Sequence, residues 1–104
     1  MTVTTRKTYP FRSFYRGKKR LAFYVINVVG EEPAISVYSD FIKDVDAISF
    51  KKSDLEEDEF RVYDFLRKHL PEELADAVLK CVKKDFGCKK GFSLKSYIAW
   101  KRRS

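Results

Sequence analysis

The sequence of 104 residues is 44% hydrophobic and 15% aromatic, and its formal net charge is +7. This length and composition predict one packed domain and exclude both a disordered chain and a chain of two domains. The longest apolar run, Leu21 to Val29, falls far short of the roughly 20 residues that a membrane-spanning helix requires. Because no apolar signal segment follows the basic N-terminus, we expect a cytoplasmic protein that does not bind membranes.

The first half of the chain predicts strands. Phe11 to Tyr15 is rich in aromatic residues, and the following Arg16 to Lys19 contains a glycine and has the composition of a turn. Residues 20–29 are almost continuously apolar, which predicts a central strand covered on both faces. After a second turn, residues 34–41 alternate as a half-exposed strand does, and a short strand over residues 47–51 completes an antiparallel meander.

The second half of the chain predicts two helices. Ser53 and Glu56 have the spacing of a capping box, in which the hydroxyl and the carboxylate each accept from a free backbone N–H. A helix is therefore expected over residues 55–69. Pro71 ends this helix and suits the first turn of a second helix over residues 72–85. Each of the two segments carries an apolar stripe for packing against the sheet.

The last segment, residues 92–103, fits two structures, since its apolar residues match both the alternation of a strand and one turn of a helix. We favour a strand that returns to the sheet. The expected fold class is therefore α+β: a three- or four-stranded antiparallel meander with two helices packed on one face and a C-terminal strand or short helix. In this fold we expect Val25, Leu66 and Val78 to be buried where the sheet and the helices meet.

The sequence offers no recognisable catalytic or metal site. His69 is the only His, so no His pair can bind a metal or relay protons, and its position at a helix end fits a structural role. No Ser lies in a nucleophile motif, and the four glycines are scattered rather than grouped in a phosphate-binding loop. We therefore expect a binding protein without a cofactor, rather than an enzyme.

The amide and cysteine contents bear on the habitat. The chain contains no Gln and a single Asn, whereas Lys, Arg, Asp and Glu make up 36% of it. This composition is typical of hyperthermophile proteins, so we expect a hyperthermophile or one of its viruses as the source. Cys81 and Cys88 flank Gly87, the expected C-terminal cap of the second helix. In a hyperthermophile these two residues could form a disulfide, and otherwise two packed thiols are expected.

The charge is distributed unevenly along the chain. Residues 1–30 carry seven bases and no acid, residues 31–80 carry seven bases and fourteen acids, and residues 81–104 carry eight bases and one acid. Two basic ends repel each other unless an anionic partner compensates their charge. We therefore expect the two ends to converge into one surface that binds an anion.

Aromatic residues are interleaved with the cations at both basic ends. Cations neutralise phosphates, and exposed rings stack on unpaired bases. The sequence therefore predicts binding of nucleic acid, either RNA or DNA, or of a ribonucleoprotein, mainly through the phosphate backbone. The candidate binding residues are Arg12, Tyr15, Arg16, Lys18, Lys19, Arg20, Lys89, Lys90, Trp100, Lys101, Arg102 and Arg103. The alternative is a protein–protein interaction module, for example a viral inhibitor of a host factor, that uses the helical half.

Overall fold

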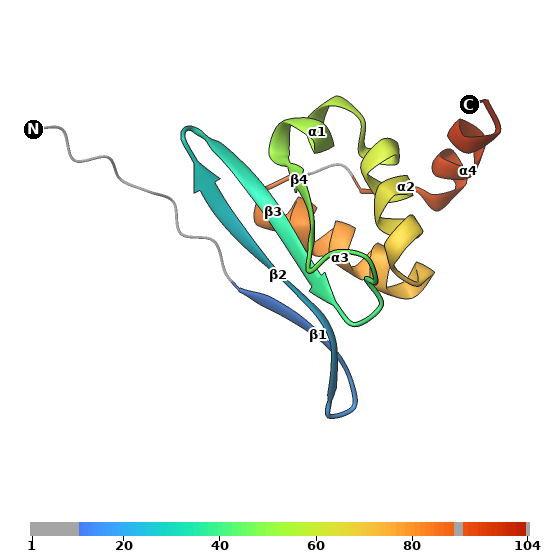
Figure 1. Ribbon diagram of the computed structural model, residues 1–104. Coiled ribbons are helices and arrows are strands. Elements are labelled where there is room, and N and C mark those ends of the chain that lie inside the picture. Colours follow the sequence, from blue (N-terminus) through green and yellow to red (C-terminus); the bar gives the residue numbers. More distant parts are fainter. Residues whose placement is uncertain (1–10, 89–90, 104) are drawn as a thin grey trace, which may run out of the picture.

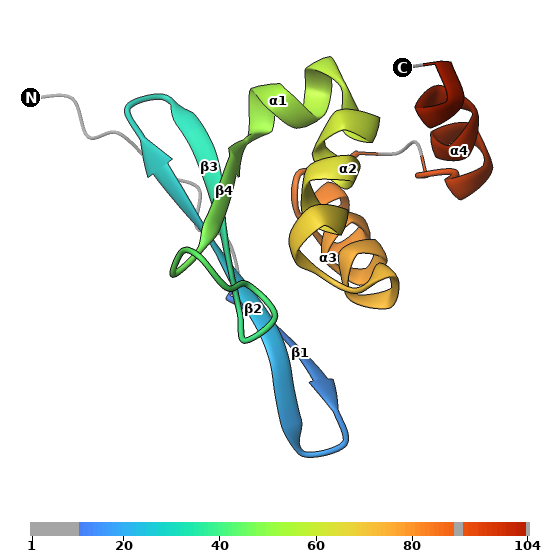
Figure 2. The same cartoon turned by 45° about the vertical axis from the view of Figure 1, so that its right-hand side comes forward.

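The computed structural model describes residues 11–88 and 91–103, apart from the side chain of Val29. Within these ranges, four strands form one antiparallel sheet in the order β1-β2-β3-β4, and four helices follow it. The strands are β1 (Arg12–Arg16), β2 (Lys19–Val29), β3 (Glu32–Ser39) and β4 (Ile48–Lys51). The helices are α1 (Lys52–Glu57), α2 (Glu59–His69), α3 (Glu72–Asp85) and α4 (Leu94–Arg103). Figures 1 and 2 show α1, α2 and α3 on one side of the sheet, so the expected α+β fold with an antiparallel meander is confirmed.

Two glycines form the tight turns on either side of β2. Gly17 has a φ of +61° and Gly30 a φ of +67°, and each is the first residue of a two-residue connection between strands. Only a residue without a Cβ adopts a positive φ at no steric cost. Turns of this kind also match the right-handed twist of the strands that they join. The sequence prediction of a strand over residues 20–29 between two neighbouring strands is therefore confirmed.

The expectation that β2 is covered on both faces is wrong. Tyr24 is completely buried on the face that the helices cover, whereas Val25 is only half-buried on the opposite face. Val25 pairs with Ser36 of β3, and Ser36 in turn pairs with Ser49 of β4, which is exposed. Successive side chains of a strand point to opposite faces, so helices on one side bury only every second residue. Val25 is therefore not part of the core.

The helix expected over residues 55–69 is divided at Asp58. Asp58 has extended backbone angles, and its carboxylate accepts from the backbone N–H groups of Phe60 at 3.1 Å and Arg61 at 3.3 Å. Asp58 is thus the N-cap of α2, a position that Asp favours because its side chain satisfies free N–H groups. The N-terminus of α1 is closed by Asp54, which accepts from the backbone N–H of Lys51 at 2.9 Å.

The capping box assigned to Ser53 and Glu56 is therefore wrong. The Ser53 hydroxyl donates to Glu32 instead, and Glu56 forms an exposed ion pair with Lys52 at 3.3 Å. Four acidic residues follow Leu55 in succession, and several of them have the chemistry of a cap. The spacing of residues alone does not decide which of them starts a helix.

The second predicted helix has the expected bounds, residues 72–85. Gly87 follows its C-cap, Phe86, with a φ of +71°, and donates its N–H to the carbonyl of Lys84 at 3.0 Å. The N–H of Cys88 donates to the carbonyl of Lys83 at 2.9 Å, which completes a Schellman motif. Leu66 of α2 and Val78 of α3 are completely buried, as predicted.

The C-terminal segment forms α4 and does not return to the sheet as a strand. Its first turn begins at Ser93, whose hydroxyl accepts from the N–H of Ser96 at 3.3 Å. Tyr63 of α2 holds the segment in place, with its ring centre 4.5 Å from that of Phe92 and 4.6 Å from that of Tyr97. Figures 1 and 2 accordingly show α4 beside α2 and away from the strands. None of the helices in the described ranges has the length and apolar character needed to cross a membrane.

Candidate functional site

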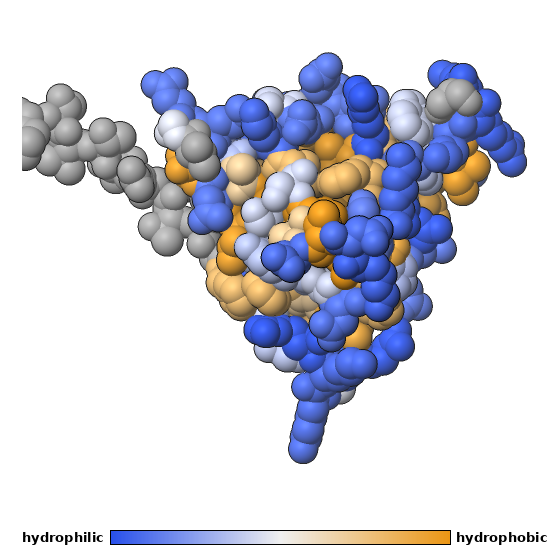
Figure 3. Space-filling view, viewed as in Figure 1, coloured by the Kyte–Doolittle hydropathy of each residue, from blue (hydrophilic) through white to orange (hydrophobic). Residues whose placement is uncertain are grey.

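The β1–β2 hairpin projects beyond the helices and ends in a cluster of cations. Figures 1 and 2 show its tip at the opposite end of the molecule from α4, and Figure 3 shows this tip as hydrophilic. The hairpin cations are Arg16, Lys18, Lys19 and Arg20, and all four are exposed. Arg16 contacts Glu73 at 3.6 Å, but both side chains are more than three-quarters exposed, so this pair is weak. Residues 11–30 contain no carboxylate that could neutralise the cluster locally.

The side of the sheet away from α1, α2 and α3 is the open face. Paired residues of neighbouring strands point to the same side, so the register brings Tyr15 beside Arg20 and Phe23 beside Tyr38. Tyr15 is 61% exposed. Among the described strand residues, the paired positions on this face from Tyr15 and Arg20 as far as Ala34 and Lys51 include no Asp or Glu. The open face is therefore neutral or basic over most of its area.

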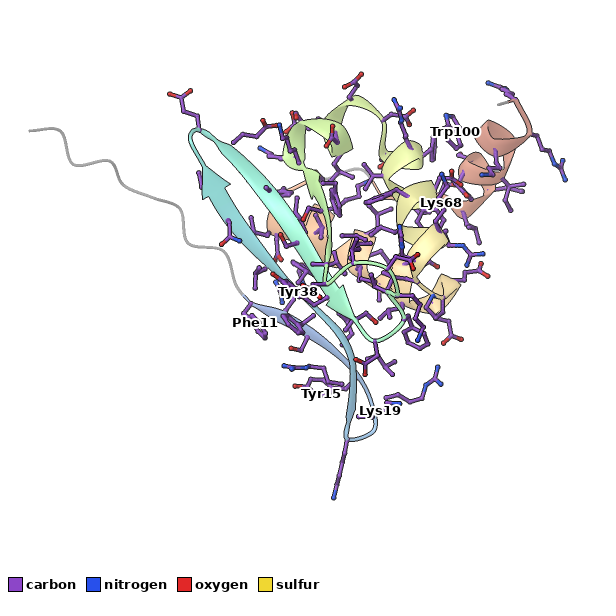
Figure 4. The ribbon with its side chains drawn as sticks, in the orientation of Figure 1. Phe11, Tyr15, Lys19, Tyr38, Lys68 and Trp100 are labelled. Carbon is purple, nitrogen blue, oxygen red and sulfur yellow. The ribbon has the colours of Figure 1, made fainter. Side chains whose placement is uncertain are left out.

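Three stacked rings cross the open face, and we call them the aromatic row: Phe11, Phe23 and Tyr38. The ring centres of Phe11 and Phe23 are 5.1 Å apart, and those of Phe23 and Tyr38 are 4.7 Å apart with the planes only 5° from parallel. Phe11 is 57% exposed, and the other two rings are half-buried. The Arg20 guanidinium lies 4.6 Å from the centre of the Phe23 ring, which joins the aromatic row to the hairpin cations. Figure 4 shows Tyr15 of β1 and Tyr38 of β3 above Lys19, together with Phe11, which immediately precedes β1.

Two carboxylates lie at the margin of this surface. Asp40 and Asp46 line a hollow of about 390 Å³ together with Arg20, Phe23 and Tyr38. They stand beyond the end of β3, on the side of the aromatic row remote from Phe11. The side of the row next to β1 is therefore the more favourable one for a polyanion, because residues 11–30 contain no carboxylate.

Arg12 was predicted as a binding residue, but it is engaged within the protein. Its guanidinium contacts the carboxylate of Asp85 at 2.5 Å, and the Tyr24 hydroxyl donates to the same carboxylate at 2.5 Å. The Asp85 side chain is only 3% exposed. Burial by itself raises the pKa of Asp85, but the hydrogen bonds from Arg12 and Tyr24 outweigh it and hold this pKa below the ordinary value. We call this group the Arg12–Asp85 clamp, because it attaches β1 and β2 to α3.

The second basic end lies on α4 and is far from the hairpin. Lys101 donates to Asp64 of α2 at 2.6 Å, and Tyr97 donates to the same carboxylate oxygen at 2.7 Å. These bonds lower the pKa of Asp64, while burial and the Asp64 hydrogen bond raise the pKa of Tyr97 to about 12. Trp100 is half-buried against Tyr97, whereas Arg102 and Arg103 are exposed.

Figures 1, 2 and 4 place α4 and the hairpin tip at opposite ends of the molecule. The expectation that the two basic ends converge into one surface is therefore wrong. It required the C-terminal segment to return to the sheet as a strand, whereas α4 remains against α2. Lys89 and Lys90, also predicted as binding residues, lie outside the described residues.

A groove of about 880 Å³ between β4, α1 and α2 is unsuited to a phosphate chain. Trp100 lies at one side of it, and Arg61 and Lys68 are its cations. Its carboxylates outnumber them and would repel a polyanion. These carboxylates are Asp54, Glu57, Asp58 and Asp64.

The two cysteines are free thiols, with Cys81 half-buried and Cys88 exposed. Among residues 11–88 and 91–103, no group of three or more His, Cys, Asp or Glu side chains is arranged to hold a metal ion.

Sequence reasoning missed the aromatic row. Phe11, Phe23 and Tyr38 were assigned to strands. The aromatic residues predicted at the binding surface were instead Tyr15 and Trp100. The sequence of β2 carries no signal for it, because Phe23 and Val25 on the open face are as apolar as the buried Ala22 and Tyr24. Comparison with known proteins adds no relative, since no family model, no curated protein and no solved structure matches the chain.

Proposed function

We propose that the protein binds nucleic acid, RNA or DNA, through the hairpin cations and the adjoining open face. The observation that carries the proposal is the cluster of four exposed cations on a projecting hairpin whose own segment contains no carboxylate. A phosphate chain that neutralises such a cluster releases condensed counterions, which favours binding. Without a polyanionic partner, the four like charges on one short turn repel one another.

The distribution of acids supports this assignment of the binding surface. The carboxylates of the 54–59 segment lie on α1 and α2, on the covered side of the sheet. An approaching polyanion is attracted by the hairpin cations and repelled by these carboxylates, which therefore favour the hairpin over α1 and the start of α2. The binding surface that we propose is therefore smaller than the one predicted from the sequence: it keeps Tyr15 and the four hairpin cations and leaves out Arg12 and α4.

The experiment is a comparison of two triple variants that remove the same charge. Lys18, Lys19 and Arg20 are replaced by Ala in one variant, and the exposed Lys68, Lys80 and Lys84 of the helices are replaced by Ala in the other. Affinity for a labelled oligonucleotide of about 12 nucleotides is measured by filter binding. The proposal requires the hairpin variant to bind more weakly than the helix variant. Equal affinities of the two variants would show that net charge alone attracts the oligonucleotide.

A further inference from the structure

The aromatic row has ring faces that the described part of the chain leaves open. Phe23 is the middle ring, with neighbours at 5.1 Å and 4.7 Å on its two sides. Among the described residues, Phe11 and Tyr38 have ring contacts with Phe23 only, so each is one end of the row. Phe11 is 57% exposed although it is among the most apolar residue types. A flat aromatic group could extend the row at either end.

Away from Asp40 and Asp46, which lie beyond Tyr38, the surroundings of the row favour a ligand that is both flat and anionic. The Arg20 guanidinium lies beside Phe23, and the exposed ring of Tyr15 pairs with Arg20 in the register. Surfaces that bind single strands combine cations that follow the backbone with rings on which successive bases stack. We infer that the open face binds single-stranded nucleic acid, with unpaired bases stacked on the ends of the aromatic row and phosphates on the hairpin cations. This inference rests on the proposed function and specifies its ligand.

A duplex cannot use the row in the same way. Its bases already stack on one another, and only their edges are accessible in the grooves. Exposing a base face to Phe11 or Tyr38 would require the base to be unstacked and unpaired first. The faces of unpaired bases are free, and stacking on one protein ring changes affinity by about 5- to 150-fold per base. The row therefore selects for single strands, whereas the hairpin cations by themselves do not.

A second copy of the chain is a less suitable occupant of the open face. A symmetric pair of open faces would bring the same patch of both copies together. Each patch includes Arg20 and adjoins three other exposed cations, so the two copies would repel each other. Charge complementarity thus favours a polyanion.

The test compares two ligands on the unaltered protein. One is an oligothymidylate of about 12 nucleotides, which has little structure of its own, and the other is an abasic oligomer with the same number of phosphates. Fluorescence anisotropy at constant salt measures the affinity for each. Because both carry the same charge, their ratio isolates the contribution of the bases. We expect the oligothymidylate to bind at least about 5-fold more tightly than the abasic oligomer, and an oligouridylate to behave in the same way.

A pair of variants locates this contribution. Phe11→Val and Tyr38→Val together remove both end rings but keep residues that suit a strand. We expect the preference for the oligothymidylate to disappear in this double variant, while its affinity for the abasic oligomer is unchanged. Phe41→Val is the matched control, because Phe41 is a 44% exposed phenyl ring outside the aromatic row. This control should keep the parent's preference.

Each other outcome has a definite meaning. Equal binding of the two oligomers by the parent would overturn base stacking and leave the proposed function standing, since phosphates would still be bound. Absence of binding to either oligomer would overturn both. A double variant that loses affinity for both oligomers equally would mean that the rings maintain the hairpin rather than bind bases. Concentration-dependent dimers that dissociate in the double variant would identify a second copy as the occupant.

Discussion

Arg12 of β1 and Asp85 of α3 are 73 positions apart in the sequence, yet their side chains form an ion pair of 2.5 Å. Tyr24 completes the Arg12–Asp85 clamp by donating to the second carboxylate oxygen. The clamp ties the hairpin, which carries the proposed binding surface, to the helical layer. A cation that sequence reasoning assigned to nucleic acid thus has a structural role, whereas its neighbours at the tip remain exposed.

We predict that Asp85→Asn lowers the free energy of unfolding by about 1.5–3 kcal/mol, because it removes a charged acceptor shared by two donors. Urea unfolding followed by circular dichroism measures this change. Arg16→Ala is the control, since Arg16 forms an exposed pair with Glu73, and it should change stability by less than about 0.5 kcal/mol. Similar losses in the two variants would contradict a special role for the clamp.

The clamp also predicts a dependence of stability on pH. The pKa of Asp85 is lowered by Arg12 and Tyr24 against the effect of burial, and the pKa of Asp64 is lowered by Lys101 and Tyr97. With a lowered pKa in the folded state, the unfolded chain binds more protons in acid. The stabilisation is therefore complete above the unfolded pKa of about 3.9 and is lost as the pH falls through the folded pKa.

We accordingly expect the free energy of unfolding to decrease below about pH 5, and to decrease less in a variant with Asp64→Asn and Asp85→Asn. Urea titrations at several pH values measure both profiles. If the profiles of the parent and the double variant run parallel in acid, other carboxylates cause the decrease.

The start of α2 gives a prediction about capping. Asp58→Ala should cost about 1 kcal/mol of stability, because it removes the acceptor for two backbone N–H groups. Ser53→Ala should change stability by less than about 0.5 kcal/mol, since Ser53 is exposed and does not cap a helix. Thermal or urea unfolding of the two variants compares them directly. The opposite ranking would restore the single helix that the sequence predicted.

The two faces of the sheet give a prediction about the core. Leu66→Ala should cost about 2–5 kcal/mol, through lost burial and the cavity left behind. Val25→Ala should cost less than about 1.5 kcal/mol, because Val25 is half-buried on the open face. The free energy of unfolding is measured for both variants. If Val25→Ala loses as much stability as Leu66→Ala, a further part of the protein covers the open face.

The sequence predicted the positions of the elements better than their environments. The turn at Gly17 and the helix boundary at Pro71 depend on local chemistry, and both were confirmed. The sequence could not predict which face of β2 points to the core, because Phe23 and Val25 on the open face are as apolar as the residues on the buried face. Periodicity alone likewise left the C-terminal segment undecided between two structures.

The remaining differences between the sequence predictions and the structure arise from contacts between parts of the chain that are distant in sequence. The C-terminal segment became a helix because Phe92 and Tyr97 pack against Tyr63, about thirty positions earlier. The aromatic row depends on the register of three strands, which no local pattern specifies. Of the twelve residues predicted to bind nucleic acid, five lie at the end of the β1–β2 hairpin, namely Tyr15, Arg16, Lys18, Lys19 and Arg20, and Arg20 contacts the row.

The dependence of binding on salt concentration tests most directly the proposal that the hairpin cations bind the phosphates of a nucleic acid. The affinity for a single-stranded oligothymidylate is measured at several salt concentrations for the parent and for the variant with Lys18→Ala, Lys19→Ala and Arg20→Ala. If each of the four hairpin cations neutralises one phosphate, the slope of log affinity against log salt is near −3 for the parent and near −1 for the variant. A difference of about two in slope is the result that this account predicts. Equal slopes for the two proteins would mean that the hairpin does not contact the phosphates, and would contradict the proposed function.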